Sequence, residues 1–106
     1  MLKPLVVLAL LFSATSALAD PATCRFAVDG TVLIDGPCDV VREANGDFRF
    51  ASPDGGWFGD VILWEDGQAG GAWNGAYGSD HAQNVMGQLT LTDGCWTNAS
   101  ITLCTR

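Results

Sequence analysis

The stretch L-T-L-T-D-G-C-W-T-N-A-S-I-T-L-C at residues 89–104 decides the fold of this 106-residue chain. Apolar residues alternate with threonines, as in strands with one buried face, and turn residues interrupt the alternation twice. If Asp93-Gly94 and Ala99-Ser100 are both two-residue turns, they place the same apolar side chains on one face. These side chains are Leu89, Leu91, Trp96, Ile101 and Leu103. The stretch therefore predicts a three-stranded antiparallel meander.

Similar turn signals recur in the rest of the chain between short apolar runs. Asp-Gly and Asn-Gly steps favour hairpins because a type I′ turn needs positive φ at both central residues. The further steps of this kind between apolar runs begin at Asp29, Asp35, Asn45, Asp54 and Asp66. No apolar stripe of helical period is long enough for a helix, and residues 79–84 would form one turn at most. We therefore expect an all-β domain: an antiparallel meander of about nine short strands, closed or half-closed into a small barrel or sandwich.

The hairpin predicted at residues 45–46 brings two arginines together. A two-residue turn there pairs Arg42 with Arg49 across the ladder. Like charges directly opposite each other destabilise a sheet, so the pair needs an explanation. One interpretation is an anion clamp made of the two guanidinium groups. The other, which we favour, is neutralisation by a neighbouring acid: Glu43, Asp39 or Asp47.

The hairpin predicted at Asp66-Gly67 contains two consecutive glycines. A two-residue turn sets residues 61–64 against residues 69–72. In the second strand, Gly70 and Gly71 leave room for a bulky neighbour or mark a bulge.

The first 19 residues have the three zones of a secretory signal peptide. Lys3 gives a positive start, residues 5–12 form an apolar run, and residues 17–19 read A-L-A, which fits the cleavage pattern. The apolar run is about half the ~20 residues that a membrane-spanning helix needs. We therefore expect a signal peptide at residues 1–19 and a single periplasmic or secreted domain at residues 20–106, with no membrane attachment after cleavage.

Four cysteines lie in the predicted domain, and an even number behind an export signal is typical of a disulfide framework. Four cysteines allow about three pairings. Local geometry favours Cys24–Cys38 and Cys95–Cys104, since a turn at residues 99–100 puts the last two opposite each other. The C-x-x-C spacing common in metal sites is not present, so no metal is expected.

The chain is acidic, with a formal net charge of −7 that becomes more negative if Lys3 leaves with the signal peptide. Such a surface repels nucleic acid and anionic membranes, so neither is expected as a partner. A basic protein or a cell-envelope glycan is compatible with it. The simpler explanation is that the charge keeps a small exported monomer in solution.

The best candidate binding surface is the glycine-rich stretch W-N-G-A-Y-G-S-D-H at residues 73–81. Aromatic rings beside amides and carboxylates suit the binding of sugars or peptides. The competing interpretation, which we favour, is that Trp57 and Trp73 plug the barrel ends and Tyr77 anchors the loop. The candidate ligand-binding residues are Trp57, Trp73, Asn74, Tyr77, Asp80 and His81.

The sequence argues against an enzyme. His81 is the single histidine, and it lies beside Ser79 and Asp80. Members of a catalytic triad must converge in space, whereas neighbours on an extended chain point apart. No catalytic residue, cofactor or metal site is therefore predicted.

Four motifs resemble those of a group of uncharacterised exported bacterial proteins. They are C-x-F-x-x-D-G from Cys24, I-D-G-x-C from Ile34, W-N-G from Trp73 and D-G-C-W-x-N from Asp93, with Cys104 as a final cysteine. The resemblance implies export and two disulfides, and it implies no activity. The chain is more distantly similar to periplasmic inhibitors of c-type lysozyme, which are small, β-rich and disulfide-bonded. Their tyrosine-cysteine opening and inhibitory loop are not recognisable here.

Two classes of function therefore remain open. The first is a non-catalytic binding module for an envelope sugar, a peptide or a basic protein, including an inhibitor of a basic lysozyme-like enzyme. The second is an envelope-structural protein whose aromatic residues serve only the core.

Overall fold

The C-terminal meander has the register that its two turns predict. Leu91 pairs with Trp96, and Trp96 pairs with Leu103 on the next strand. Both residues of the turn at 93–94 have positive φ, 52° and 84°, as a type I′ turn requires. The fully buried members of the predicted apolar face are Leu89, Ile101 and Leu103. Trp96 is partly buried and packs against them, whereas Leu91 is 46% exposed. The predicted face therefore lines the interior of the domain except at Leu91.

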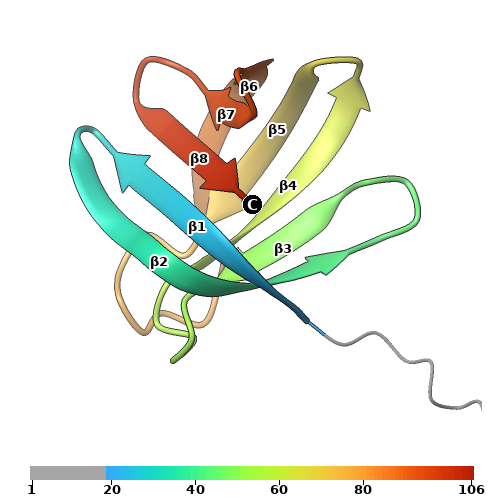
Figure 1. Cartoon of the computed structure of the whole chain (residues 1–106). Coiled ribbons are helices and arrows are strands. Elements are labelled where there is room, and N and C mark those ends of the chain that lie inside the picture. Colours follow the sequence, from blue (N-terminus) through green and yellow to red (C-terminus); the bar gives the residue numbers. More distant parts are fainter. Residues whose placement is uncertain (1–18) are drawn as a thin grey trace, which may run out of the picture.

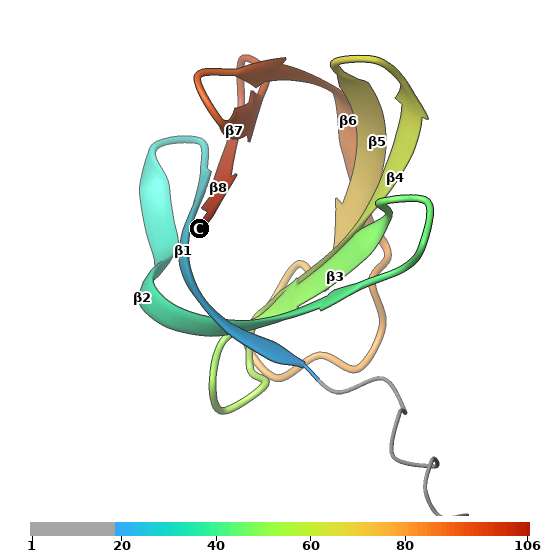
Figure 2. The same ribbon diagram turned by 45° about the vertical axis from the view of Figure 1, so that its right-hand side comes forward.

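The computed structural model describes residues 19–106, which form a closed antiparallel barrel (Figures 1 and 2). Its strands are β1 (Asp20–Val28), β2 (Thr31–Arg42), β3 (Phe48–Ala51), β4 (Phe58–Glu65), β5 (Gln68–Trp73), β6 (Asn84–Thr92), β7 (Cys95–Thr97) and β8 (Ile101–Thr105). Each strand pairs with the next along the chain, and β8 pairs with β1. The all-β prediction is confirmed, and the architecture is the barrel. The predicted signal peptide lies outside the described residues, except for Ala19.

The structure has eight strands rather than nine because the Asp35-Gly36 step is not a turn. It lies within β2, a continuous strand of 12 residues. Gly36 has φ of 145°, a conformation that favours glycine, and it stays in the ladder opposite Cys24. The prediction of a hairpin at this step is therefore wrong: the glycine bends one long strand instead of separating two short ones.

The hairpin between β2 and β3 forms, but its loop is longer than predicted. The backbone N–H of Glu43 donates to the carbonyl of Asp47, and Gly46 between them has φ of 99°. A three-residue loop that ends in a residue with positive φ is a common hairpin variant. The extra residue shifts the register by one, so Arg42 faces Phe48 instead of Arg49. The predicted arginine pair is therefore wrong.

Side chains fill the barrel interior, as an eight-stranded barrel allows. The largest fully buried side chains are Phe26, Phe50, Leu89, Leu103, Val61 and Cys24. The rings of Phe26 and Phe50 meet edge to face, with centroids 4.9 Å apart, which is a preferred arrangement of aromatic pairs. The interior is thus a packed core, and ligand sites have to be sought at the ends and on the outer face.

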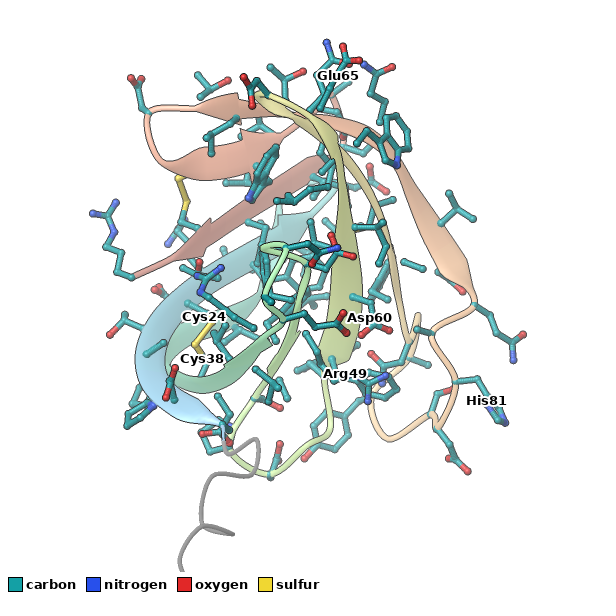
Figure 3. The ribbon with its side chains drawn as sticks, turned by 90° about the vertical axis from the view of Figure 1, so that its right-hand side faces the viewer. Cys24, Cys38, Arg49, Asp60, Glu65 and His81 are labelled. Atoms are coloured by element: carbon teal, nitrogen blue, oxygen red, sulfur yellow. A yellow bond between two sulfur atoms is a disulfide. The ribbon has the colours of Figure 1, made fainter. Side chains whose placement is uncertain are left out.

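Both predicted disulfides are confirmed. Cys24 and Cys38 join β1 to β2 inside the core, with Cα atoms 5.7 Å apart (Figure 3). Cys95 and Cys104 lie opposite each other on β7 and β8, with Cα atoms 4.2 Å apart. Two disulfides are typical of proteins in oxidising compartments. Within residues 19–106, no helix is long and apolar enough to cross a membrane.

Candidate functional site

The predicted binding loop lies at one end of the barrel, beside the loop that joins β3 to β4 (Figures 1 and 2). In this loop pair, the ring centroids of Trp57 and Trp73 are 5.9 Å apart. Trp73 also meets Phe26 of the core at a centroid distance of 5.6 Å. Both tryptophans are partly buried and pack against the core. They therefore close this end of the barrel, which favours the plug interpretation for them.

Asn74 holds the two loops of this end together. Its side chain is buried, and Nδ2 donates to the carbonyls of Gly56, Ala76 and Ser79 at 2.9, 3.0 and 3.1 Å. Its Oδ1 accepts a hydrogen bond from the backbone N–H of Phe58 at 3.1 Å. Both polar atoms of the side chain are thus engaged in the interior of the loops. This geometry gives Asn74 a structural role and does not present it to a ligand.

Tyr77 is 62% exposed, yet its hydroxyl and its ring both have partners. The hydroxyl donates to the carboxylate of Asp54, and the ring covers Gly56 so closely that an added Cβ there would collide with it. The hydrogen bond from Tyr77 is the largest cause that lowers the pKa of Asp54 to about 2, with further bonds from Gly56 and Ser52. The same bond raises the pKa of Tyr77. Tyr77 therefore anchors the loop while one part of its ring stays open to solvent.

We expect Tyr77→Phe to raise the pKa of Asp54 toward its ordinary value of 3.8. The folded-state pKa of about 2 lies below that value, so ionised Asp54 stabilises the folded state above pH ~4. This stabilisation is lost as the pH falls from about 4 to about 2. In the variant, the free energy of unfolding should fall less over this pH range. Urea midpoints between pH 2 and 5, with the carboxyl of Asp54 followed by NMR, measure both effects. An Asp54 titration identical in wild type and variant would contradict the assignment, and Asp54→Asn serves as the control in which the acid effect is absent.

Asp80 and His81 do not join the aromatic cluster. Both are exposed, and in Figure 3 His81 points away from the barrel. No helical turn forms between residues 79 and 84, and β6 begins directly after this loop. Within the part of the chain that the structure describes, no three of the His, Cys, Asp and Glu side chains are grouped closely enough to hold a metal ion.

The two arginines of the predicted anion clamp have different neighbours. Arg49 binds Asp60 on the outer face through two hydrogen bonds of 2.8 and 3.2 Å (Figure 3). Arg42 donates to the hydroxyl of Thr105 at 3.3 Å, and its guanidinium lies 4.8 Å from the centroid of the Phe48 ring. Paired residues on adjacent strands share a face, and successive residues on one strand point to opposite faces. Since Arg42 pairs with Phe48, it lies on the opposite face from Arg49. The structure therefore does not bring the two guanidinium groups together as a clamp.

A trough on the outside of the barrel is a site that the sequence reasoning missed. Its floor is β5, where Gly70, Gly71 and Ala72 carry almost no side chain. The walls are formed by Asp60, Ile62 and Trp64 of β4 and by Val85 and Gln88 of β6. The trough has a volume of about 430 Å³, which lies within the range of about 300–1,000 Å³ typical of ligand pockets.

The walls of the trough are mostly apolar, and their three apolar side chains are open to solvent. Trp64 is 57% exposed, Ile62 49% and Val85 79%. A register shift between Leu63 and Glu65 marks a bulge at Trp64, and bulges re-aim side chains. The indole leans over Gly70, where an added Cβ would collide with it. Exposed apolar side chains that line a hollow together are candidates for an interaction site on a soluble protein.

No family model, curated protein or solved structure matches the chain. The resemblances drawn from the four motifs and from lysozyme inhibitors therefore stay predictions. The candidate sites are therefore the barrel end with residues 73–81 and the outer face along β5.

One sequence signal could have found the trough. Residues 61–64 read V-I-L-W, an unbroken apolar run, whereas a strand with one wet face alternates apolar and polar residues. Only one set of these side chains can enter the barrel, so the other set must be exposed and apolar. The neighbouring glycines at 70 and 71 indicate that the strand beside it leaves that exposed set uncovered.

Proposed function

We propose that the protein is a non-catalytic binding module of the periplasm or the extracellular space, and that its ligand lies in the trough along β5. The observation that carries this proposal is the exposed indole of Trp64 over a floor without side chains. Buried aromatic anchors dominate binding energies at interfaces because a flat ring supplies a large contact area. The walls stand on neighbouring strands of a closed barrel, so little ordering is needed when a ligand binds.

The trough is a better candidate than the loop at residues 73–81. In that loop, Trp73 packs on the core and Asn74 is engaged with three backbone carbonyls. An envelope-structural protein whose aromatic residues serve only the core accounts for Trp57 and Trp73. It does not account for Trp64, which lies outside the barrel and contributes little to the core.

Trp64→Ala should weaken ligand binding by about 30–100-fold, which is the range of an aromatic hot spot. The melting temperature should fall by only a few degrees, because more than half of the side chain is already exposed. Calorimetric titration with soluble peptidoglycan fragments, with a lysine-leucine peptide and with a c-type lysozyme measures the first effect. Thermal unfolding measures the second.

Tyr77→Ala is the matched control, because Tyr77 is an equally exposed aromatic residue at the end of the barrel away from Trp64. It should leave the affinity for every probe unchanged. Binding that survives Trp64→Ala, or that is lost only in Tyr77→Ala, would contradict the placement of the ligand in the trough.

A further inference from the structure

The trough shares lining residues with two hollows that have acidic side chains in their linings. Trp64 lines both the trough and a hollow of about 400 Å³ next to the β4–β5 hairpin. Ile62 lines both the trough and a hollow of about 620 Å³ next to the β2–β3 hairpin. The acidic side chains of these two hollows, outside the Arg49–Asp60 pair, form what we call the acidic rim: Glu43, Asp47, Glu65 and Asp66.

Figure 3 shows where Glu65 of the acidic rim lies relative to the Arg49–Asp60 pair. Glu65 lies at the tip of the β4–β5 hairpin, and Asp60 lies farther along β4 beside Arg49. The hairpins β2–β3 and β4–β5 are tied together by the backbone N–H of Leu63, which donates to Asp47 Oδ1 at 2.8 Å. The acidic rim and the apolar wall therefore belong to one connected surface.

The charge of the acidic rim is not neutralised by the described residues. The ion pairs among residues 19–106 are Arg25–Asp35 and Arg49–Asp60, and neither includes a residue of the acidic rim. Arg49 is the one basic side chain that lines these three hollows, and Asp60 already binds it. Asp47 accepts hydrogen bonds, which fix its position without cancelling its charge. Glu65 and Asp66 therefore carry uncompensated negative charge in the hollow that Trp64 also lines. Glu43 and Asp47 add negative charge in the hollow that Ile62 lines.

We infer that the occupant of the trough is a basic polypeptide segment, in which an apolar side chain packs against Trp64 and flanking lysine or arginine residues lie at the acidic rim. This inference rests on the proposed function, since it names the ligand class of the same trough. Complementary charge steers the encounter and fixes the register, while the apolar contact supplies affinity. A lysine or arginine stem also packs well on an indole face.

The same charges disfavour the other occupants of such a face. Two copies of this chain would bring two acidic rims together, which opposes a homodimer through this surface. Nucleic acid and anionic glycans are repelled for the same reason. A neutral glycan could stack on Trp64, but it would leave four carboxylates without a counter-charge.

The experiment uses the whole chain without its predicted leader and three peptides of equal length. The first has leucine flanked by lysines, the second has glycine in place of leucine, and the third has serines in place of the lysines. We expect only the first to bind, with an affinity that falls at least tenfold between about 50 and about 300 mM salt. Glu65→Gln with Asp66→Asn should weaken it by about tenfold, and Trp64→Ala should weaken it by about 30–100-fold.

Asp29→Asn with Asp80→Asn is the matched control, because it removes the same charge from exposed positions outside the acidic rim. It should bind like the wild type, and an equal loss there would show a net-charge effect and overturn the inference. If the serine peptide or soluble peptidoglycan fragments bind as tightly in a Trp64-dependent manner, the inference fails and the proposed function stands. If no probe binds in a way that depends on Trp64, both fail.

Discussion

Asn74→Ala should lower the free energy of unfolding by about 3–5 kcal/mol, an effect as large as the loss of a core phenylalanine. The side chain is only 4% exposed and takes part in four hydrogen bonds to the backbone of two loops. Each buried backbone group that loses its partner costs about 1–3 kcal/mol. At about 4–8 °C per kcal/mol for a domain of this size, the melting temperature should fall by more than about 12 °C. Thermal and urea unfolding followed by circular dichroism measure both values.

Asn98→Ala is the matched control for burial. Asn98 also takes part in four side-chain hydrogen bonds, donating to two carbonyls of β6 and accepting from the N–H groups of Ser100 and Ile101. It is exposed, so water can replace these bonds, and the expected cost is about 1 kcal/mol. Equal losses in the two variants would show that burial is not what makes Asn74 important.

The double change Cys24→Ala with Cys38→Ala should cost about 4–5 kcal/mol. The chain-entropy model gives about 3 kcal/mol for a loop of this length, which has a sequence separation of 14. Removing two sulfurs from a packed interior adds ~1–2 kcal/mol, because the core loses contacts that it cannot fully replace. For a small domain this removes a large fraction of the total stability. Equilibrium unfolding under non-reducing conditions measures the loss.

The second disulfide provides the comparison. Cys95 is partly exposed and the sequence separation is 9, so Cys95→Ala with Cys104→Ala should cost about 3 kcal/mol, nearly all of it from chain entropy. Because the two loops are of similar length, most of the difference between the two double variants reflects the tighter packing of the Cys24–Cys38 disulfide. A larger loss from the C-terminal pair would contradict the role of the core sulfurs.

The C-terminal meander could be predicted because two turns constrain it independently. The Asp93-Gly94 turn and the turn at residues 99–100 each place Trp96 on the buried face, and the two constraints agree. The cysteines follow from the same register. Where one turn alone decided the pairing, at residues 45–46, a loop with one additional residue placed Arg42 and Arg49 on different faces of the sheet.

The Asp35-Gly36 step shows a second limit of sequence reasoning. The same dipeptide forms a turn at 29–30, where Asp29 and Gly30 have φ of 51° and 83°, and a bend within a strand at 35–36. Glycine permits both conformations, and only the pairing of β2 with its neighbours on both sides decides between them.

The location of the trough depends on which aromatic side chains are exposed, and residue propensities do not predict this exposure. The sequence shows that Trp57, Trp73 and Tyr77 are aromatic, but it does not show how exposed each ring is. Whether a tryptophan lies inside a barrel or on its wall depends on strand register, and at Trp64 on a bulge. The plug interpretation of Trp57 and Trp73 agrees with their contacts, whereas Trp64 gave no signal beyond the unbroken apolar run around it.

The pairing of β8 with β1 has a consequence for the order of events during synthesis. Cys24 lies opposite Thr105, so one edge of β1 has no partner until β8 has left the ribosome. The ladder that closes the cylinder joins the most distant parts of the described chain, and such long-range contacts form slowly. Until then β1 offers an open edge. The barrel can therefore close only after β8 has been synthesised, and the earlier strands stay in an open sheet until then.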